Sequence, residues 1–229
     1  MAAGAAAGDP GGHDPVIRAV VSDFGGVLTT PLAGSFQAVA DRSGISLAAI
    51  GRAFAALRDR EGVHPLHELE CGRISEVAFV AALERSLREL SGRDVALADF
   101  RELLWQGLAP NEPMIRFMES LRAEGYRMAL LTNNVREWES RWRALAPIDE
   151  IFELVVDSAF VGMRKPEPQI YEQTLARLGV AAEESLFIDD REDNCAGARA
   201  VGMQAVRYRE VEQAVAEIRA ALEAGRGAV

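Results

Sequence analysis

The sequence predicts an α/β fold in which a parallel sheet carries an inserted segment made of helices. Three observations predict this fold. An apolar strand and a glycine-rich loop lie near the N-terminus, the next 80 residues or so show only helical periodicity, and the chain from Met114 onward alternates helices with short apolar strands. Such alternation is typical of parallel strands joined by crossover helices. With 229 residues, 49% of them hydrophobic, the chain can bury a core and support an insertion.

The first strand is expected at residues 19–21, where a short, largely β-branched run leads to Asp23. Gly25 and Gly26 then require a sharp loop. Open α/β sheets bind ligands at the carboxyl ends of their strands, which is where Asp23 would lie. An unperturbed Asp titrates near ~3.9, so Asp23 is expected to be ionised at pH 7 and able to attack phosphorus. On this stretch alone, an Asp-Gly-Gly turn without chemistry is the alternative.

Residues 31–110 are expected to form a helical cap domain. Ser46 and Ser75 lie where helix N-caps are expected. A proline-rich linker at residues 109–113 returns the chain to the core, which is expected to comprise residues 15–30 and 111–229. Apolar residues repeat at helical spacing in three stretches: Phe36, Val39 and Ala40; Ile50, Phe54 and Leu57; Val77, Val80, Leu83 and Leu87.

Four further strands are expected after the linker, at residues 128–131, 152–156, 186–188 and 204–206. Five helices are expected around these strands. The first contains Phe117 and Leu121, the second follows Thr132, and the next two cover residues 169–178 and 195–201. The last is an amphipathic helix through Val211 and Leu222. Polar residues end three strands: Asp23, Thr132-Asn133 and Asp189-Asp190. Because parallel strands end at the same sheet edge, these residues are expected to converge at one pocket.

The chemistry of these residues fits attack on a phosphate ester. A phosphate dianion repels an incoming carboxylate, and Lys165, in the loop before a later helix, supplies a compact ammonium. Asp23 and Asp190 can hold Mg²⁺, which takes oxygen ligands and uses one or two carboxylates with substrate phosphate. The Gly25 carbonyl is a further candidate ligand. Asp189 is expected to orient either a metal-bound water or Lys165 without binding the metal itself.

The remaining phosphate oxygens require hydrogen-bond donors. The Thr132 hydroxyl and the backbone N–H groups at the start of the following helix can supply them. The sequence therefore predicts one site for a phosphorylated ligand, assembled from residues about 170 positions apart.

Four segments carry a family resemblance: Asp23-Phe24-Gly25-Gly26-Val27, Leu131-Thr132-Asn133, Lys165-Pro166-Glu167-Pro168 and Phe187-Ile188-Asp189-Asp190. In this order they resemble the motifs of the haloacid dehalogenase-like superfamily, over residues 16 to about 210. Residues 161–171 and 197–203 are especially similar to the phosphatase half of soluble epoxide hydrolases. The chain stops where an epoxide-hydrolysing half would begin, so that second activity is not expected.

The resemblance implies a Rossmann-like core, a helical cap between the first two motifs, Mg²⁺ as cofactor and Asp23 as nucleophile. It also implies that Thr132 and Asn133 hold phosphate and that Asn194 supports the site from behind, where relatives often have Asp. The expected function is a phosphoric monoester hydrolase that acts on a small phosphorylated metabolite through an aspartyl-phosphate. A homodimer is a further hypothesis for the assembly.

One position departs from the family pattern. Active phosphatases of the superfamily usually carry a second Asp two residues after the nucleophile, where this chain has Gly25, and the dehalogenase branch usually has Tyr there. General acid–base catalysis is commonly worth about 10²–10⁴-fold, so its loss affects poor leaving groups most. Two alternatives follow: a phosphotransferase using the same aspartate, and a ligand-binding relative without turnover.

Composition excludes several other classes. The 35 acidic and 25 basic residues give a net charge of −10, which disfavours nucleic acid as a partner. Two cysteines, Cys71 and Cys195, offer no disulfide framework or metal spacing, which fits a reducing compartment. Residues 1–14 resemble a disordered tail more than a signal peptide, and no window approaches the ~18 apolar residues of a membrane span. A cytoplasmic protein without membrane partners is expected.

Several other residues invite functional interpretations that we discount. His64 and His67 in the cap are the right type for substitute general acids, but their spacing also suits a helix start. Trp138 and Trp142, expected on one helix face, fit packing better than a substrate wall or a dimer contact. The remaining residues in this group have simpler structural explanations: His13 in the tail, Cys195 in the core, and Glu192 and Asp193 in a first helical turn.

Overall fold

The computed structural model describes residues 16–31, 33–97 and 99–224, and its core is a five-stranded parallel sheet. The strands lie in the order β3-β2-β1-β4-β5, and all four neighbouring pairs are parallel. This arrangement confirms the predicted α/β fold with a helical insert. The strands have the following bounds: β1 Ala19–Ser22, β2 Arg127–Thr132, β3 Leu154–Asp157, β4 Ser185–Asp189 and β5 Gln204–Arg207.

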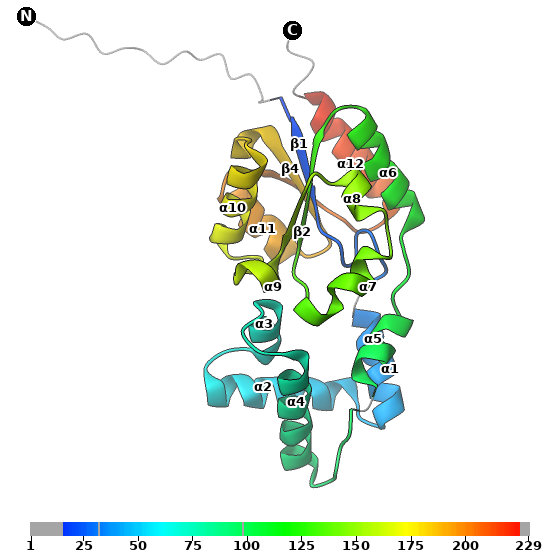
Figure 1. Cartoon of the computed structure of the whole chain (residues 1–229), viewed down its shortest axis with the longest axis vertical. Coiled ribbons are helices and arrows are strands. Elements are labelled where there is room, and N and C mark those ends of the chain that lie inside the picture. The colour runs from blue at the N-terminus through cyan, green and yellow to red at the C-terminus, as the bar shows by residue number, and fades with distance from the viewer. Residues whose placement is uncertain (1–15, 32, 98, 225–229) are drawn as a thin grey trace, which may run out of the picture.

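Helices cover both faces of the sheet. In Figure 1, α6, α8 and α12 lie on one side of the strands, and α10 and α11 lie on the other. The helices of the core have the following bounds: α6 Glu112–Ala123, α7 Glu139–Arg143, α8 Ile148–Ile151, α9 Ser158–Val161, α10 Pro168–Leu178, α11 Glu192–Ala200 and α12 Val211–Ala224, with 3₁₀ turns η1 Arg136–Trp138 and η2 Ala182–Glu184.

The alternation of side chains along β1 divides the interior into two apolar layers. Val20 belongs to the cluster that includes α6 and α12, whereas Ala19 and Val21 belong to the cluster that includes α10 and α11. All three side chains are fully buried. Successive residues of a strand point to opposite faces, so helices on both sides leave β1 no polar position until its end.

The insert between β1 and α6 is built from helices, and the described residues between these elements contain no strand longer than a single bridge. Thr29 and Pro110 form that isolated antiparallel bridge, at the point where the chain leaves and rejoins the core. Figure 1 shows the insert beyond one end of the sheet, with α3 facing α9. The helices of the insert have the following bounds: α1 Ala33–Ser43, α2 Leu47–Glu61, α3 Pro65–Glu70, α4 Glu76–Ser91 and α5 Phe100–Gln106.

The predicted caps are present in the insert. Ser46 Oγ accepts a hydrogen bond from the Ala49 N–H, and Ser75 Oγ accepts one from the Ala78 N–H, both over 3.2 Å. These bonds satisfy donors that the first helical turn leaves free. Division of the chain into domains at residues 30 and 110 remains a prediction, and the predicted tail, including His13, lies outside the described residues.

The largest differences from the sequence prediction concern three elements. The third strand begins at Leu154 instead of residue 152, because the Phe152 N–H still bonds to the Ile148 carbonyl at the end of α8. Helix α11 begins three residues earlier than predicted, at Glu192. The single helix predicted after Thr132 is wrong: an extended segment leads into η1 and the short α7.

Candidate active site

Three carboxylates meet at the carboxyl edge of the sheet. Asp23 follows β1, Asp189 ends β4 and Asp190 follows it, and each offers an oxygen within 4.8 Å of the others. The Asp23 N–H bonds to the Ile188 carbonyl over 2.8 Å, so the strand pairing itself fixes this residue beside β4. The convergence predicted for these strand ends is therefore present.

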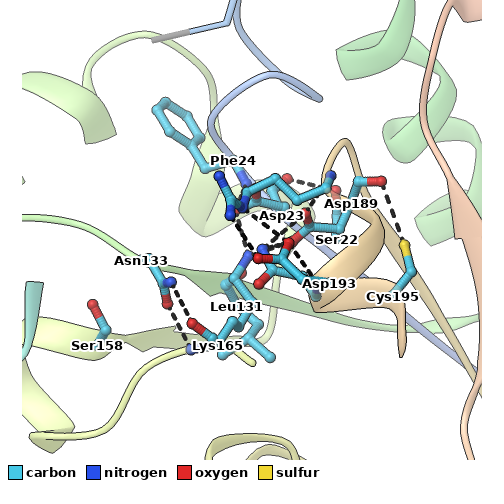
Figure 2. A network of polar contacts seen from close by, with 12 residues as sticks. Ser22, Asp23, Phe24, Leu131, Asn133, Ser158, Lys165, Asp189, Asp193 and Cys195 are labelled. Carbon is cyan, nitrogen blue, oxygen red and sulfur yellow. Dashed lines mark hydrogen bonds and ion pairs between the residues drawn. The ribbon is translucent and has the colours of Figure 1, made fainter. Parts of the chain in front are cut away.

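Lys165 lies at the centre of this cluster. Its Nζ is 2.7 Å from Asp23 Oδ1, 2.7 Å from Asp189 Oδ2 and 2.8 Å from the Leu131 carbonyl oxygen (Figure 2). The side chain is 1% exposed, and these three acceptors match the three hydrogens of an ammonium group. Lys165 is also the only lysine of the chain, a feature that sequence reasoning overlooked although every other basic side chain apart from histidine is Arg.

Asn133 and Asn194 hold this cluster from two sides. Asn133 forms a pair of bonds with the Lys165 backbone, donating from Nδ2 to the carbonyl over 3.0 Å and accepting from the N–H over 2.9 Å (Figure 2). Asn194 Nδ2 donates to both Asp189 oxygens over 3.0 Å, and the Arg191 N–H donates to Asp189 Oδ1 over 2.9 Å. Asp189 is thus fully buried, and both of its carboxylate oxygens accept hydrogen bonds. Its role in orienting Lys165 or a metal-bound water remains a prediction.

Burial dominates the electrostatics of the cluster. It raises the pKa of Asp23 to about 8, against the opposing effect of Lys165, and it raises the pKa of Asp190 with a further contribution from Asp189. Burial also disfavours the Lys165 ammonium, but Asp189 and Asp23 prevail and raise the pKa of Lys165. Burial thus outweighs the Lys165 ammonium and favours the protonated form of Asp23, in contrast to the ionised form expected from the unperturbed value. Further positive charge beside it would favour the carboxylate.

A polar cavity of about 500 Å³ opens next to Asp23. The core contributes Gly25, Asn133, Lys165, Asp190 and Asn194 to its lining, and the insert contributes His64, His67 and Glu70. Residues predicted from four distant segments therefore face one space, closed on one side by the insert.

Sequence reasoning missed three charged residues of this cavity: Glu70, Arg164 and Arg191. Arg164 Nε donates to Glu70 Oε2 over 2.8 Å, and the Ser158 hydroxyl donates to the Glu70 carbonyl over 2.5 Å. Glu70 belongs to α3 of the insert, so both contacts join the insert to the core. No local pattern predicts such a pair, because its members lie 94 positions apart.

Thr132 does not line the polar cavity. It is buried and lines a smaller cavity of about 60 Å³ that adjoins the polar one. We call this smaller cavity the apolar chamber; its walls include Phe24, Leu69, Phe79, Trp105, Trp138 and Trp142. The part assigned to Thr132 in binding phosphate remains a prediction.

The two histidines of the insert line the polar cavity, but their states do not suit a proton donor. His64 caps α3, and its Nδ1 accepts a bond from the Leu66 N–H over 3.2 Å. Burial, followed by Arg164, lowers the pKa of His67 to about 4, so its imidazole is neutral at pH 7. A neutral imidazole can accept a proton more readily than it can donate one.

The other discounted residues have structural surroundings. Trp138 and Trp142 are buried, with Trp142 against Phe24 at 5.3 Å between ring centroids, which agrees with packing. Cys195 is buried, and both cysteines are free thiols. Glu192 and Asp193 lie in the first turn of α11, as expected. No helix among the described residues is long and apolar enough to cross a membrane.

Comparison with known proteins gives a family match over most of the chain. A family model for haloacid dehalogenase-like hydrolases matches residues 17–202. Bifunctional epoxide hydrolase 2 of Mus musculus is 29% identical over 214 residues, covering 88% of this chain but 38% of its own length. Phosphoserine phosphatase of Thermus thermophilus is 35% identical over 115 residues, covering 50% of this chain and 45% of its own. The chain thus spans less than half the length of these two relatives.

A solved structure shares the fold. The wild-type haloacid dehalogenase family enzyme from Bacteroides thetaiotaomicron, in complex with magnesium and inorganic phosphate, superposes with a TM-score of 0.60 at 22% identity. The similarity covers 84% of this chain and 94% of that one. Both the sheet order and the helical insert therefore have a counterpart in a solved structure.

Proposed function

The chain belongs to the haloacid dehalogenase-like hydrolases, and within this family we propose that it is a Mg²⁺-dependent phosphatase acting on a small phosphorylated metabolite. One observation carries the proposal: Asp23 lies 2.7 Å from a buried lysine, in a cluster of three carboxylates at the sheet edge. Relatives named as phosphatases, and the magnesium and phosphate in a structure of the same fold, support it.

The residues at the sheet edge fit a divalent cation. Asp23 and Asp190 offer hard oxygen ligands within 4.8 Å, and burial is the main cause of their raised pKa values. We assign Asp23, Asp190 and the Gly25 carbonyl as the groups that would hold Mg²⁺, with Asp189 and Asn194 supporting them. The cation, when bound, would favour the ionised Asp23 and neutralise phosphate charge.

In the proposed reaction, a carboxylate oxygen of Asp23 forms a bond to phosphorus while the bond from phosphorus to the alcohol oxygen breaks. The alcohol leaves with a proton, and the phosphoryl group remains on Asp23. Water then adds to phosphorus, Asp23 is released as a carboxylate, and inorganic phosphate departs. Lys165 offsets the negative charge that develops, Thr132 and Asn133 hold phosphate oxygens, and the insert limits access of bulk water.

Gly25 shapes which substrates the site can use. An Asp at this position would donate the proton to the leaving alcohol, and here the polar cavity meets a glycine. The proposed enzyme therefore depends on solvent, on the substrate or on a residue of the insert for that proton.

The absence of an acidic side chain at position 25 also supports two alternative functions. A phosphotransferase would pass the phosphoryl group from Asp23 to an alcohol faster than to water. A ligand-binding relative would bind Mg²⁺ or phosphate esters without turnover. We also propose a cytoplasmic location, since both cysteines are free thiols. A homodimer remains a prediction.

The decisive experiment measures phosphate release from a panel of phosphorylated metabolites and one activated aryl phosphate, with and without Mg²⁺. Wild type is compared with Asp23→Asn, which keeps the side-chain size and removes the nucleophile. Turnover that needs both Asp23 and Mg²⁺ supports the phosphatase. Transfer to an added alcohol that exceeds hydrolysis supports the phosphotransferase, and the absence of Asp23-dependent turnover from every compound supports the ligand-binding relative.

A further inference from the structure

The apolar chamber differs in character from the polar cavity beside it. Its walls combine Phe24, Trp138 and Trp142 of the core with Leu69 and Phe79 of the insert. Among the residues that line it, Glu70 is the only charged one, and its carboxylate is bound to Arg164 over 2.8 Å. The indole N–H groups of the three tryptophans that line it are buried without a hydrogen-bond partner, but most of the lining is apolar. A charged group in this chamber would lose its hydration without meeting an opposite charge that is free, whereas an apolar group would gain by leaving water.

The chamber adjoins the reacting atoms. Gly25, Asn133, Phe36 and Leu66 line both cavities, and Gly25 lies two residues from Asp23. A Cβ atom placed on Gly25 would meet no other heavy atom within 4 Å. The space that a side chain would fill at this position is therefore open, at a residue that lines both cavities.

We propose that the apolar chamber binds a short apolar group on the alcohol part of the substrate, so that the preferred substrates are phosphate monoesters of alcohols bearing such a group. This inference rests on the proposed phosphatase function and specifies its substrate class. It is carried by the position of the chamber beside Asp23 and by the character of its walls.

The volume limits the size of the group. A water-sized group needs about 10–15 Å³ of cavity measured in this way, so about 60 Å³ holds roughly four to six non-hydrogen atoms. A branched alkyl group fits this range. The polar cavity of about 500 Å³ then remains for the phosphate and for any polar part of the alcohol.

The tryptophans provide a direct probe of the chamber. The chain has three, Trp105, Trp138 and Trp142, and all three line it. Intrinsic tryptophan fluorescence is therefore sensitive to binding in this space. Binding can be measured with alkylphosphonates, whose carbon–phosphorus bond resists hydrolysis, so the test does not require turnover.

The experiment uses the full chain with Mg²⁺ and two parallel series of compounds, with alkyl groups from methyl to octyl and including the branched isobutyl and 3-methylbutyl groups. The phosphates give kcat/KM, and the matching phosphonates give Kd from fluorescence. We expect both to improve by about fourfold per added methylene until the chamber is full, and then to decline. Isobutyl phosphate is compared with 2,3-dihydroxypropyl phosphate, and we expect at least a tenfold preference for the apolar ester.

Variants at Leu66 link the preference to the chamber. Leu66→Ala enlarges it and should move the optimum toward longer chains, while Leu66→Phe reduces it and should move the optimum toward methyl phosphate. Leu103→Ala is the matched control, because Leu103 is a half-buried leucine of the insert that lines neither cavity. This control should leave the optimum unchanged.

The outcomes separate this inference from the proposed function. Phosphonate binding that strengthens with chain length, without any turnover, would support the chamber and overturn the phosphatase. Asp23-dependent turnover that is equal for the apolar and polar esters, or an optimum that does not move in either Leu66 variant, would overturn the inference and leave the phosphatase standing.

Discussion

Replacing Lys165, the only lysine of the chain, should separate the contribution of this residue to folding stability from its contribution to catalysis. Lys165→Met keeps the length of the side chain but removes the ammonium, which lies 2.7 Å from Asp23 and 2.7 Å from Asp189. The side chain is 1% exposed, so water cannot replace the lost partner without disturbing the core. The variant leaves two buried carboxylates facing each other across an apolar group.

The magnitude follows from the bonds lost. Hydrogen bonds to charged groups contribute about 1.5–3 kcal/mol each, and Lys165 makes two to carboxylates and one to the Leu131 carbonyl. Removing one member of a buried ion pair typically costs about 3–5 kcal/mol of folding free energy. We therefore expect a loss of about 3–5 kcal/mol in the free energy of unfolding at pH 7. For catalysis, loss of one such electrostatic group typically lowers kcat by about 10²–10³.

The assay combines urea unfolding with phosphate release and includes a compensating variant. Asp189→Asn in the Lys165→Met background removes one unpaired carboxylate and should recover about 1–3 kcal/mol of stability without restoring activity. Selective labelling with ¹⁵N-lysine gives one side-chain signal, because the chain has one lysine, and that signal should disappear in Lys165→Met.

Two results would refute this reasoning. An unfolding free energy for Lys165→Met within about 0.5 kcal/mol of wild type would mean that the buried ion pairs contribute nothing. Recovery of activity together with stability in the double variant would mean that Lys165 acts only by holding the fold.

Three further substitutions test separate features. Gly25→Asp should raise the rate of hydrolysis of esters with poor, polar leaving groups by about 10²–10⁴-fold and change the rate for activated aryl phosphates little. The side chain has room, since a Cβ there meets no heavy atom within 4 Å. Equal effects on both kinds of ester would contradict a role as general acid. Gly26→Ala should weaken Mg²⁺ binding, measured by calorimetry, because the new Cβ would lie 2.7 Å from Asp190 Cγ and the φ of +82° disfavours a side chain. An unchanged Mg²⁺ affinity would contradict the assignment of Asp190 as a metal ligand. Burial raises the pKa of Asp157 to about 6 from 3.8, so its ionisation destabilises the fold increasingly between these pH values and fully above them. Asp157→Asn should therefore raise the free energy of unfolding at pH 8 by at most about 3 kcal/mol, with little change at pH 3.5. The same gain at both pH values, measured by urea unfolding, would contradict the burial argument.

The sequence predicted the sheet and its functional edge because both depend on local patterns. Val20 and Val21 belong to a short, fully apolar run, as a strand buried on both faces requires, and the polar residue after the run marks where the strand ends. Asp23 and Asp190 could thus be placed together before any distance was known. The family resemblance then indicated which reaction these residues perform together, which no single strand end indicates by itself.

The contacts between insert and core could not be predicted in this way. The Glu70–Arg164 pair joins residues whose neighbours in the sequence give no sign of each other, and Thr132 faces the apolar chamber because the insert closes over it. The segment after Thr132 was predicted as one helix, with Trp138 and Trp142 on a shared face. The extended Val135 and the 3₁₀ turn instead bury Trp138 and Trp142 under the insert.

The glycine at position 25 connects the missing acid with the substrate class. An Asp placed there would supply a proton donor, but its side chain would also occupy open space at a residue that lines both the polar cavity and the apolar chamber. If that space admits an apolar group of the substrate, Gly25→Asp should improve polar esters and impair branched alkyl esters in the same enzyme. A gain for both classes would show that the carboxyl and the apolar group do not compete, and the chamber would then have to be reached by a route that avoids Gly25.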